Sequence, residues 1–177
     1  MKRILGIAIL ATTLMACNQA EKKASDTKDS TTKDSLVAKS NVVLKDTKIN
    51  TIFTQYEGVK NALVKSDSIA AQQAAASLQT SLVGYKGCES TAVTAKKIAD
   101  SKNLVSQRKD FTALSSDLIA LFKHADLTEG TIYVQHCPMA NKGDGGDWLS
   151  TEKDIKNPYY GDQMLTCGRV TEEIKTK

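Results

Sequence analysis

The sequence predicts a mostly α-helical domain: a four-helix up-down bundle, followed by a small C-terminal two-stranded β element and a structured loop. Four segments between residues 46 and 123 carry apolar residues in steps of three and four, the spacing of one face of an amphipathic helix. Short connections between these segments favour antiparallel neighbours. After residue 126 the pattern changes to the β-branched and aromatic residues that are typical of strands.

Residues 1–16 have the order of a secretory signal peptide, with two basic residues before a short apolar run. Leu14 lies three residues before Cys17, and the small Ala16 directly precedes the cysteine, which resembles the processing box of bacterial lipoproteins. We therefore expect a lipoprotein signal peptide and lipid attachment at Cys17; the alternative is ordinary cleavage near Ala16. Buried acyl chains would hold the protein in the cell envelope, facing the periplasm, and we expect the outer membrane.

A flexible tether is predicted to follow, so that residues 17–45 comprise the lipidated Cys17 and a linker. Residues 18–35 are mostly Lys, Asp, Ser and Thr, which bury too little apolar surface to offset the cost of chain ordering. Residues 36–44 are mildly apolar and either dock on the domain or end the linker. The folded domain is predicted over residues 46–177.

The first two helices are predicted from about Asp46 to Leu63 and from Ile69 to Leu82. Ser66-Asp67 supplies the N-cap of the second helix, and Gly84 with Gly87 ends it. The second helix is rich in alanine and so able to pack closely against its neighbours.

A shorter third helix is predicted to begin at Ser90, as its cap, and to run through Ile98. The fourth helix follows Asn103 and carries its apolar stripe from Phe111 to Phe122. We interpret the stripes of all four helices as core rather than as cofactor pockets.

Two strands are predicted after the helices. Thr131 to Val134 is β-branched and aromatic, and Arg169 to Ile174 alternates well enough to be its partner. The long stretch between them is predicted to be the structured loop.

The charge balance excludes a nucleic-acid partner. The formal net charge of the 177-residue chain is +4, and it falls to +2 once Lys2 and Arg3 leave with the signal peptide, which is too little for a phosphate-backbone partner. From Gly130 to the C-terminus six basic residues face seven acidic ones, so a cation meets no strong repulsion there. The sequence does not predict an oligomeric state.

Sulfur ligands are concentrated in the last third of the chain. His136-Cys137-Pro138-Met139 is followed by Met164-Leu165-Thr166-Cys167, and these two methionines are the only ones outside the signal peptide. Thiolates and thioethers are soft ligands that select Cu(I) or another soft metal ion. If the two predicted strands pair, Cys137, Met139, Met164 and Cys167 meet in one site.

His136 is a further candidate ligand for the same ion. It is the second choice because adjacent residues on extended backbone point to opposite faces, so its side chain faces away from that of Cys137. The same argument disfavours a thiol enzyme that uses Cys137 with His136, and we expect no enzymatic activity.

A structural disulfide is an equal alternative to the metal site. Exported proteins meet oxidising conditions, and a Cys137–Cys167 bond would close a loop of about 30 residues, worth on the order of 3.5 kcal/mol in the chain-entropy model. Cys88 is left over and is typical of a small buried hydrophobic residue.

Three blocks of sequence resemble a domain-of-unknown-function family of periplasmic proteins: Tyr133 to Met139, Trp148 to Ser150, and Asn157 to Gly168. The resemblance extends over Ile49 to Ile174. Members of that family occur as small lipoproteins and as an extra domain on the adaptor subunits of efflux pumps for copper and other heavy metals, where a metal-binding role is proposed.

The resemblance implies metal handling and a heavy-metal efflux adaptor as a partner. Its matched sulfur residues are Cys137, Met139, Met164 and Cys167, whereas the following positions look like scaffold: Trp148, Asn157, Pro158 and Tyr159. The chain departs from the family at residues 142–147, where its loop is longer and more acidic, and Cys88 is outside the family pattern. We expect Cu(I) buffering or chaperoning; the alternative is a structural or interaction module with a permanent disulfide that docks on an envelope or efflux partner.

Overall fold

The computed structural model describes residues 42–176, so the expected signal peptide 1–16, Cys17 and the tether up to residue 41 lie outside the described residues. No helix in the described part of the chain is long and apolar enough to span a membrane. The helices and strands are α1 Thr47–Val64, α2 Ser68–Val83, α3 Glu89–Asp100, α4 Leu104–Lys123, β1 Val43–Leu44, β2 Leu127–Glu129, β3 Thr131–Cys137, β4 Gly146–Ser150 and β5 Arg169–Lys175, with short 3-10 turns at Ala140–Gly143 and Gly161–Gln163.

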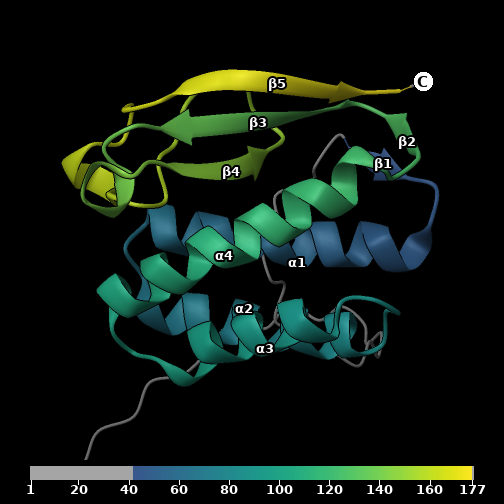
Figure 1. Ribbon diagram of the computed structural model, residues 1–177, viewed down its shortest axis with the longest axis horizontal. Coiled ribbons are helices and arrows are strands. Elements are labelled where there is room, and N and C mark those ends of the chain that lie inside the picture. Colours follow the sequence, from purple (N-terminus) through teal and green to yellow (C-terminus); the bar gives the residue numbers. More distant parts are fainter. Residues whose placement is uncertain (1–41, 177) are drawn as a thin grey trace, which may run out of the picture. The chain divides into compact units, whose positions relative to one another are not determined.

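The elements of the domain lie in three layers (Figure 1). Helices α1 and α4 form the middle layer, with α2 and α3 on one side and the sheet of β3, β4 and β5 on the other. Strand β4 is the one that packs against α4 and α1. The sheet therefore meets the helices mainly through one of its edge strands.

Three of the four helices begin where the sequence predicts, because a short polar side chain caps each one. Asp46 accepts hydrogen bonds from the first turn of α1, Asp67 does so for α2, and Asn103 for α4. The third helix differs: its N-cap is Cys88, which makes no side-chain cap bond, and the predicted cap Ser90 lies inside the helix.

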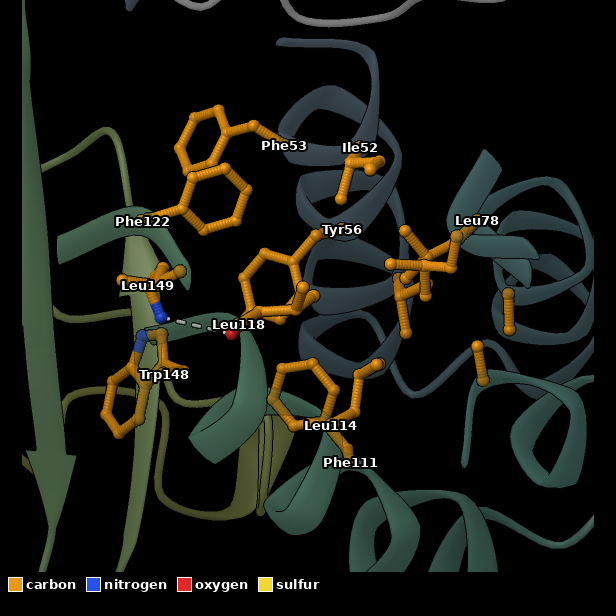
Figure 2. Close-up of a cluster of buried hydrophobic side chains, with 14 of the residues drawn as sticks. Ile52, Phe53, Tyr56, Leu78, Phe111, Leu114, Leu118, Phe122, Trp148 and Leu149 are labelled. Atoms are coloured by element: carbon orange, nitrogen blue, oxygen red, sulfur yellow. Dashed lines mark hydrogen bonds between the residues drawn. The ribbon is translucent and has the colours of Figure 1, made fainter. Parts of the chain in front are cut away.

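Aromatic side chains from α1, α4 and β4 form the centre of the core (Figure 2). Phe53 meets Phe122 edge to face with ring centroids 5.1 Å apart, and Tyr56 stacks on Phe111 at 5.5 Å. Such pairs stabilise a core beyond the area that they bury. They join the two middle helices, which are distant in sequence.

The Tyr56 hydroxyl is the polar link between the helices and the sheet. It forms a 2.8 Å hydrogen bond with the Ser115 hydroxyl of α4. It also accepts a 3.0 Å hydrogen bond from the Leu149 amide of β4 (Figure 2). All three residues are fully buried. The bond to Leu149 satisfies a backbone amide on the side of β4 that no described strand pairs.

The predicted pairing of the C-terminal strands is present, since β3 and β5 are antiparallel with His136 opposite Arg169. The prediction of only two strands is wrong, because β4 pairs with the other edge of β3 and gives the order β4-β3-β5. A second small sheet joins β1 to β2. Val43 and Leu44 therefore dock on the domain and do not belong to a free linker.

The prediction of a mostly α-helical domain is confirmed, but the up-down four-helix bundle is not. In a bundle the helices enclose a core of their own. Here α1 and α4 bury their aromatic residues against each other and against Trp148 and Leu149 of the sheet. The apolar periodicity identified the helices without showing which element covers each face.

We expect Tyr56→Phe to lower the free energy of unfolding by about 1–3 kcal/mol, because it leaves the Leu149 amide and the Ser115 hydroxyl buried without their shared partner. Urea denaturation checks this. Tyr133→Phe is the control, because the Tyr133 hydroxyl makes no hydrogen bond to another described residue. Equal stability of the two variants would contradict the assigned link.

Candidate functional site

The two cysteines of the C-terminal region lie side by side. The Sγ atoms of Cys137 and Cys167 are 3.4 Å apart, and both residues are free thiols in this structure. Cys137 is fully buried at the end of β3, whereas Cys167 is half-buried. The pair is thus close together, with one thiol accessible from solvent and the other enclosed.

Strand pairing and one glycine bring the thiols together. His136 pairs with Arg169, so the residues just before β5 run beside the end of β3, where Cys137 lies. Gly168 has a φ of 146°, and a Cβ atom there would lie 2.8 Å from the His136 carbonyl oxygen. Any larger residue would push this segment away from β3.

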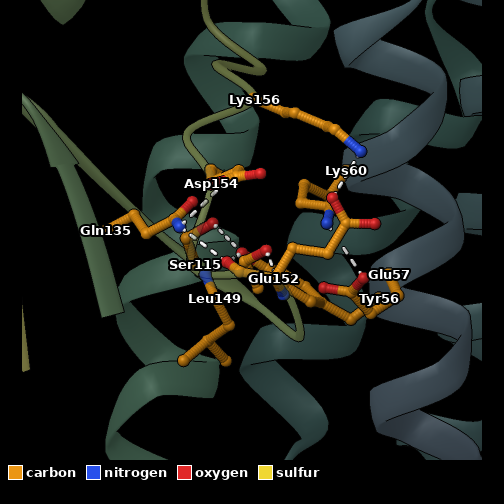
Figure 3. A network of polar contacts seen from close by, with 10 residues as sticks. Tyr56, Glu57, Lys60, Ser115, Gln135, Leu149, Glu152, Asp154 and Lys156 are labelled. Carbon is orange, nitrogen blue, oxygen red and sulfur yellow. Dashed lines mark hydrogen bonds and ion pairs between the residues drawn. The ribbon is translucent and has the colours of Figure 1, made fainter. Parts of the chain in front are cut away.

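The segment that joins β4 to β5 crosses from one edge of the sheet to the other and carries Cys167. Its first part is held by Gln135, a fully buried residue of β3. The Gln135 side-chain amide donates to the carbonyl oxygens of Glu152, Lys153 and Asp154, at 2.8, 3.2 and 3.4 Å (Figure 3). One amide group thereby anchors three successive peptide units.

A group of charged residues lies at the same place (Figure 3). Glu57 and Lys60 of α1 form a 2.9 Å ion pair that is almost entirely buried, and Glu152 pairs with Lys156 in the connecting segment. Burial raises the pKa of the Glu57 carboxyl, and attraction to Lys60 offsets part of that rise. The hydrogen bond from Lys156 lowers the pKa of Glu152.

Sequence reasoning missed this charged group, although a signal for it was present. Glu57 and Lys60 follow Phe53 by four and seven residues, so they extend the apolar stripe of α1. Charged residues at stripe positions are buried, and buried charges require partners.

The two methionines predicted as ligands, Met139 and Met164, are tied less directly to the thiol pair than the two thiols are to each other. The Met164 carbonyl oxygen accepts a 3.0 Å hydrogen bond from the Cys167 amide, and the Met164 side chain is half-buried. Met139 is 52% exposed, and its carbonyl oxygen accepts a hydrogen bond from the Tyr160 hydroxyl. Each methionine is thus held through its backbone carbonyl, and about half of Met139 is exposed to solvent.

His136 is engaged on the other face of β3. Its Nδ1 atom lies 2.8 Å from Oδ1 of Asp147, the residue opposite it on β4. Among the described residues, no three His, Cys, Asp or Glu side chains gather into a group able to hold a metal ion. The two thiols are therefore the predicted ligands that the structure brings together.

The two thiols affect each other's chemistry. The pKa of the Cys167 thiol is raised, first by its hydrogen bond with Cys137 and then by partial burial. Burial also raises the pKa of Cys88, which lies at the start of α3 away from the pair. The Cys167 thiol therefore holds its proton more tightly than a free cysteine, and binding of a metal ion or oxidation there has to release that proton.

Residues 52–130 match the model of a family described as "Protein of unknown function (DUF3347)". This match supports the expected resemblance to a domain-of-unknown-function family; it covers most of α1 and all of α2, α3 and α4, and it ends before β3 and the segment that carries Cys167. No curated protein and no solved structure matches the chain.

We expect maleimide to label Cys167 first in the native, reduced protein with Cys17→Ser, because Cys137 and Cys88 are buried. The labelling should be slower than that of a free cysteine at pH 7 and should accelerate at higher pH, because the raised pKa leaves less thiolate. Mass spectrometry of peptides from a time course checks the order. Early labelling of Cys137 would contradict the assigned geometry.

The stability of the wild type relative to Glu57→Gln should fall as the pH rises from about 4 to 8. The folded-state pKa of Glu57 is raised, so the native protein binds its proton more tightly than the unfolded chain and loses that stabilisation as the proton leaves. Glu152→Gln is the matched control with the opposite sign, because the pKa of Glu152 is lowered in the folded state. Chemical denaturation at several pH values tests both slopes, and equal slopes would contradict the assignment.

Proposed function

We propose that this protein is a membrane-tethered protein of the periplasm that binds a soft metal ion, Cu(I) above all, and buffers or chaperones it for metal efflux. The observation that carries this proposal is the 3.4 Å separation of the Cys137 and Cys167 sulfurs. Two thiols at this distance, one of them accessible, form a ready chelating pair.

The separation fits a bound ion with only a small adjustment. Two thiolates on a tetrahedral ion with bonds of about 2.3 Å lie about 3.8 Å apart, so the thiols need to open by a few tenths of an ångström. Side-chain rotation at the half-buried Cys167 supplies that movement without changing the strands.

The set of available ligands favours a soft ion over zinc. Structural zinc sites ask for four ligands, mostly Cys and His, and no third residue of these types joins the thiol pair within the described residues. Thioether sulfur binds Cu(I) well, and Met139 and Met164 lie two and three residues from the two thiols. The exposed Met139 side chain can swing toward an ion that approaches from solvent.

The cellular setting of the proposal comes from the N-terminal sequence and the family resemblance. Lipid attachment at Cys17 would hold the domain on the periplasmic side of the membrane, at a distance limited by the length of residues 18–41. The partner would be the adaptor of a heavy-metal efflux pump. We propose a binding role and not an enzymatic one, because His136 is paired with Asp147 on the face of β3 opposite to Cys137.

A disulfide-stapled interaction module is the second candidate, and the same sulfur distance favours it. A bond between Cys137 and Cys167 would require the sulfurs to approach to about 2.05 Å. It would stabilise the fold by on the order of 3.5 kcal/mol in the chain-entropy model. Thiol counting after denaturation distinguishes the two: in the Cys17→Ser chain purified without reductant, three reactive thiols favour the metal site, and one favours the disulfide.

We expect one Cu(I) ion to bind tightly per reduced chain in an anaerobic titration against a chromophoric chelator. Cys137→Ser should abolish this binding because it removes half of the thiolate pair, and Met164→Leu should weaken it by losing a soft ligand of similar volume. Cys88→Ser is the control, since it places a favourable N-cap residue at the start of α3 and leaves the pair intact. Failure of the wild type to compete would favour the interaction module.

A further inference from the structure

Asn157 is a fully buried residue of the segment between β4 and β5, and all of its polar groups are used there. Its side-chain Nδ2 donates to the Cys167 carbonyl oxygen at 2.8 Å, and its Oδ1 accepts from the Tyr159 amide at 2.8 Å. Its backbone amide donates to the Leu165 carbonyl oxygen at 2.8 Å, and its own carbonyl accepts from the Gly161 amide at 3.0 Å. One residue therefore closes the loop from position 157 to position 167.

The start of this loop is fixed to the helical layers by Arg108 of α4. Its guanidinium donates to the Pro158 carbonyl oxygen at 2.9 Å, and also to the Leu63 carbonyl oxygen and the Ser66 hydroxyl in the turn between α1 and α2. Tyr159 adds a hydrogen bond to the Asp147 carbonyl oxygen of β4. The position of Asn157 is thus set by both helices and sheet.

At the end of the loop, the side chain of Asn157 holds the Cys167 carbonyl, in addition to the close approach of Gly168 to β3. Cys137 is held by its own strand, where it pairs with Gly146, whereas Cys167 precedes the first residue of β5 and belongs to no strand. The Asn157 donor of this bond is buried and the bond itself is partly buried, so competition from water is reduced and the bond holds its partner more strongly than an exposed one. Of the residues with the size of asparagine, only asparagine both donates to Cys167 and accepts from Tyr159.

We propose that Asn157 is the positioning residue of the thiol pair, which holds Cys167 at chelating distance from Cys137. The consequence of this inference, a preorganised metal site, rests on the proposed function. The positioning of the two thiols does not. Loss of a residue that orients a metal ligand typically lowers metal affinity by about 10–100-fold, and we expect that range here.

The test uses the full-length chain in detergent with Cys17→Ser and Cys88→Ser, so that only the pair is left. Asn157→Asp keeps the acceptor for Tyr159 and removes the donor to Cys167; Asn157→Ala removes both. Gln107→Ala is the control, because Gln107 is also fully buried and bonds to the carbonyl oxygens of Ser68 and Ser101, between helices and away from the thiols. It should lower stability without moving the thiols.

Two quantities are measured on each variant. The first is Cu(I) affinity by chelator competition. The second is the effective concentration of the two thiols, obtained from their equilibrium with reduced and oxidised glutathione: each disulfide formed in the protein converts one oxidised glutathione into two thiols. We expect both Asn157 variants to lower each quantity by about 10–100-fold, and Gln107→Ala to leave both unchanged.

The outcomes separate this proposal from the proposed function. A wild type that fails to bind Cu(I) overturns the metal function, and the glutathione equilibrium still decides the role of Asn157. An unchanged effective concentration in Asn157→Asp overturns the positioning role whatever the metal result. If neither Asn157 variant folds, Arg108→Gln, which frees the start of the loop, takes their place with an expected loss of several-fold, and no loss overturns the proposal.

Discussion

The site depends on one constraint: apart from the 3-10 turn Gly161–Gln163, the segment between β4 and β5 is packed against the domain without regular secondary structure, so side chains satisfy much of its backbone. Buried carbonyl and amide groups without partners cost free energy. Gln135 supplies donors for three successive carbonyls, Arg108 for a fourth, and Asn157 for the carbonyl of Cys167. The same bonds that make burial tolerable also fix where the second thiol lies.

The aromatic core determines how this segment meets the helices. Tyr159 contacts Phe111 of α4 and Trp148 of β4, with ring centroids 5.8 and 6.1 Å apart, and so continues the cluster that begins with Tyr56 and Phe111. A Cβ atom at Gly146 would lie 2.6 Å from the Tyr159 ring, so β4 needs a glycine where the ring crosses it. Packing of the aromatic core therefore helps to set the geometry of the thiol pair, and a cavity in this core would shift the segment that carries Cys167.

Sequence patterns predicted the local secondary structure and missed the contacts between elements that are distant in sequence. Helix periodicity, with Asp67 and Asn103 as caps, located the helices, because these signals lie within a few residues of each other. Strand β4 was missed because Gly146–Ser150 has little strand character and forms only by pairing with β3. Pairing of β3 with β5 brought Cys137 and Cys167 together as predicted, whereas the roles of Gln135 and Arg108 depend on contacts that no spacing reveals.

Two reactions are proposed for the thiol pair, disulfide formation and metal binding, and they stabilise the fold in different ways. Closing the disulfide stabilises the fold by a fixed amount, on the order of 3.5 kcal/mol in the chain-entropy model. A metal ion that binds the folded protein and not the unfolded chain stabilises the fold by an amount that grows with the ratio of the free ion concentration to the dissociation constant. Under the proposed function, a metal ion would bind only while the thiols stay reduced. Enclosure of Cys137 favours that state, because an external disulfide has to react first at Cys167, whose raised pKa slows the attack.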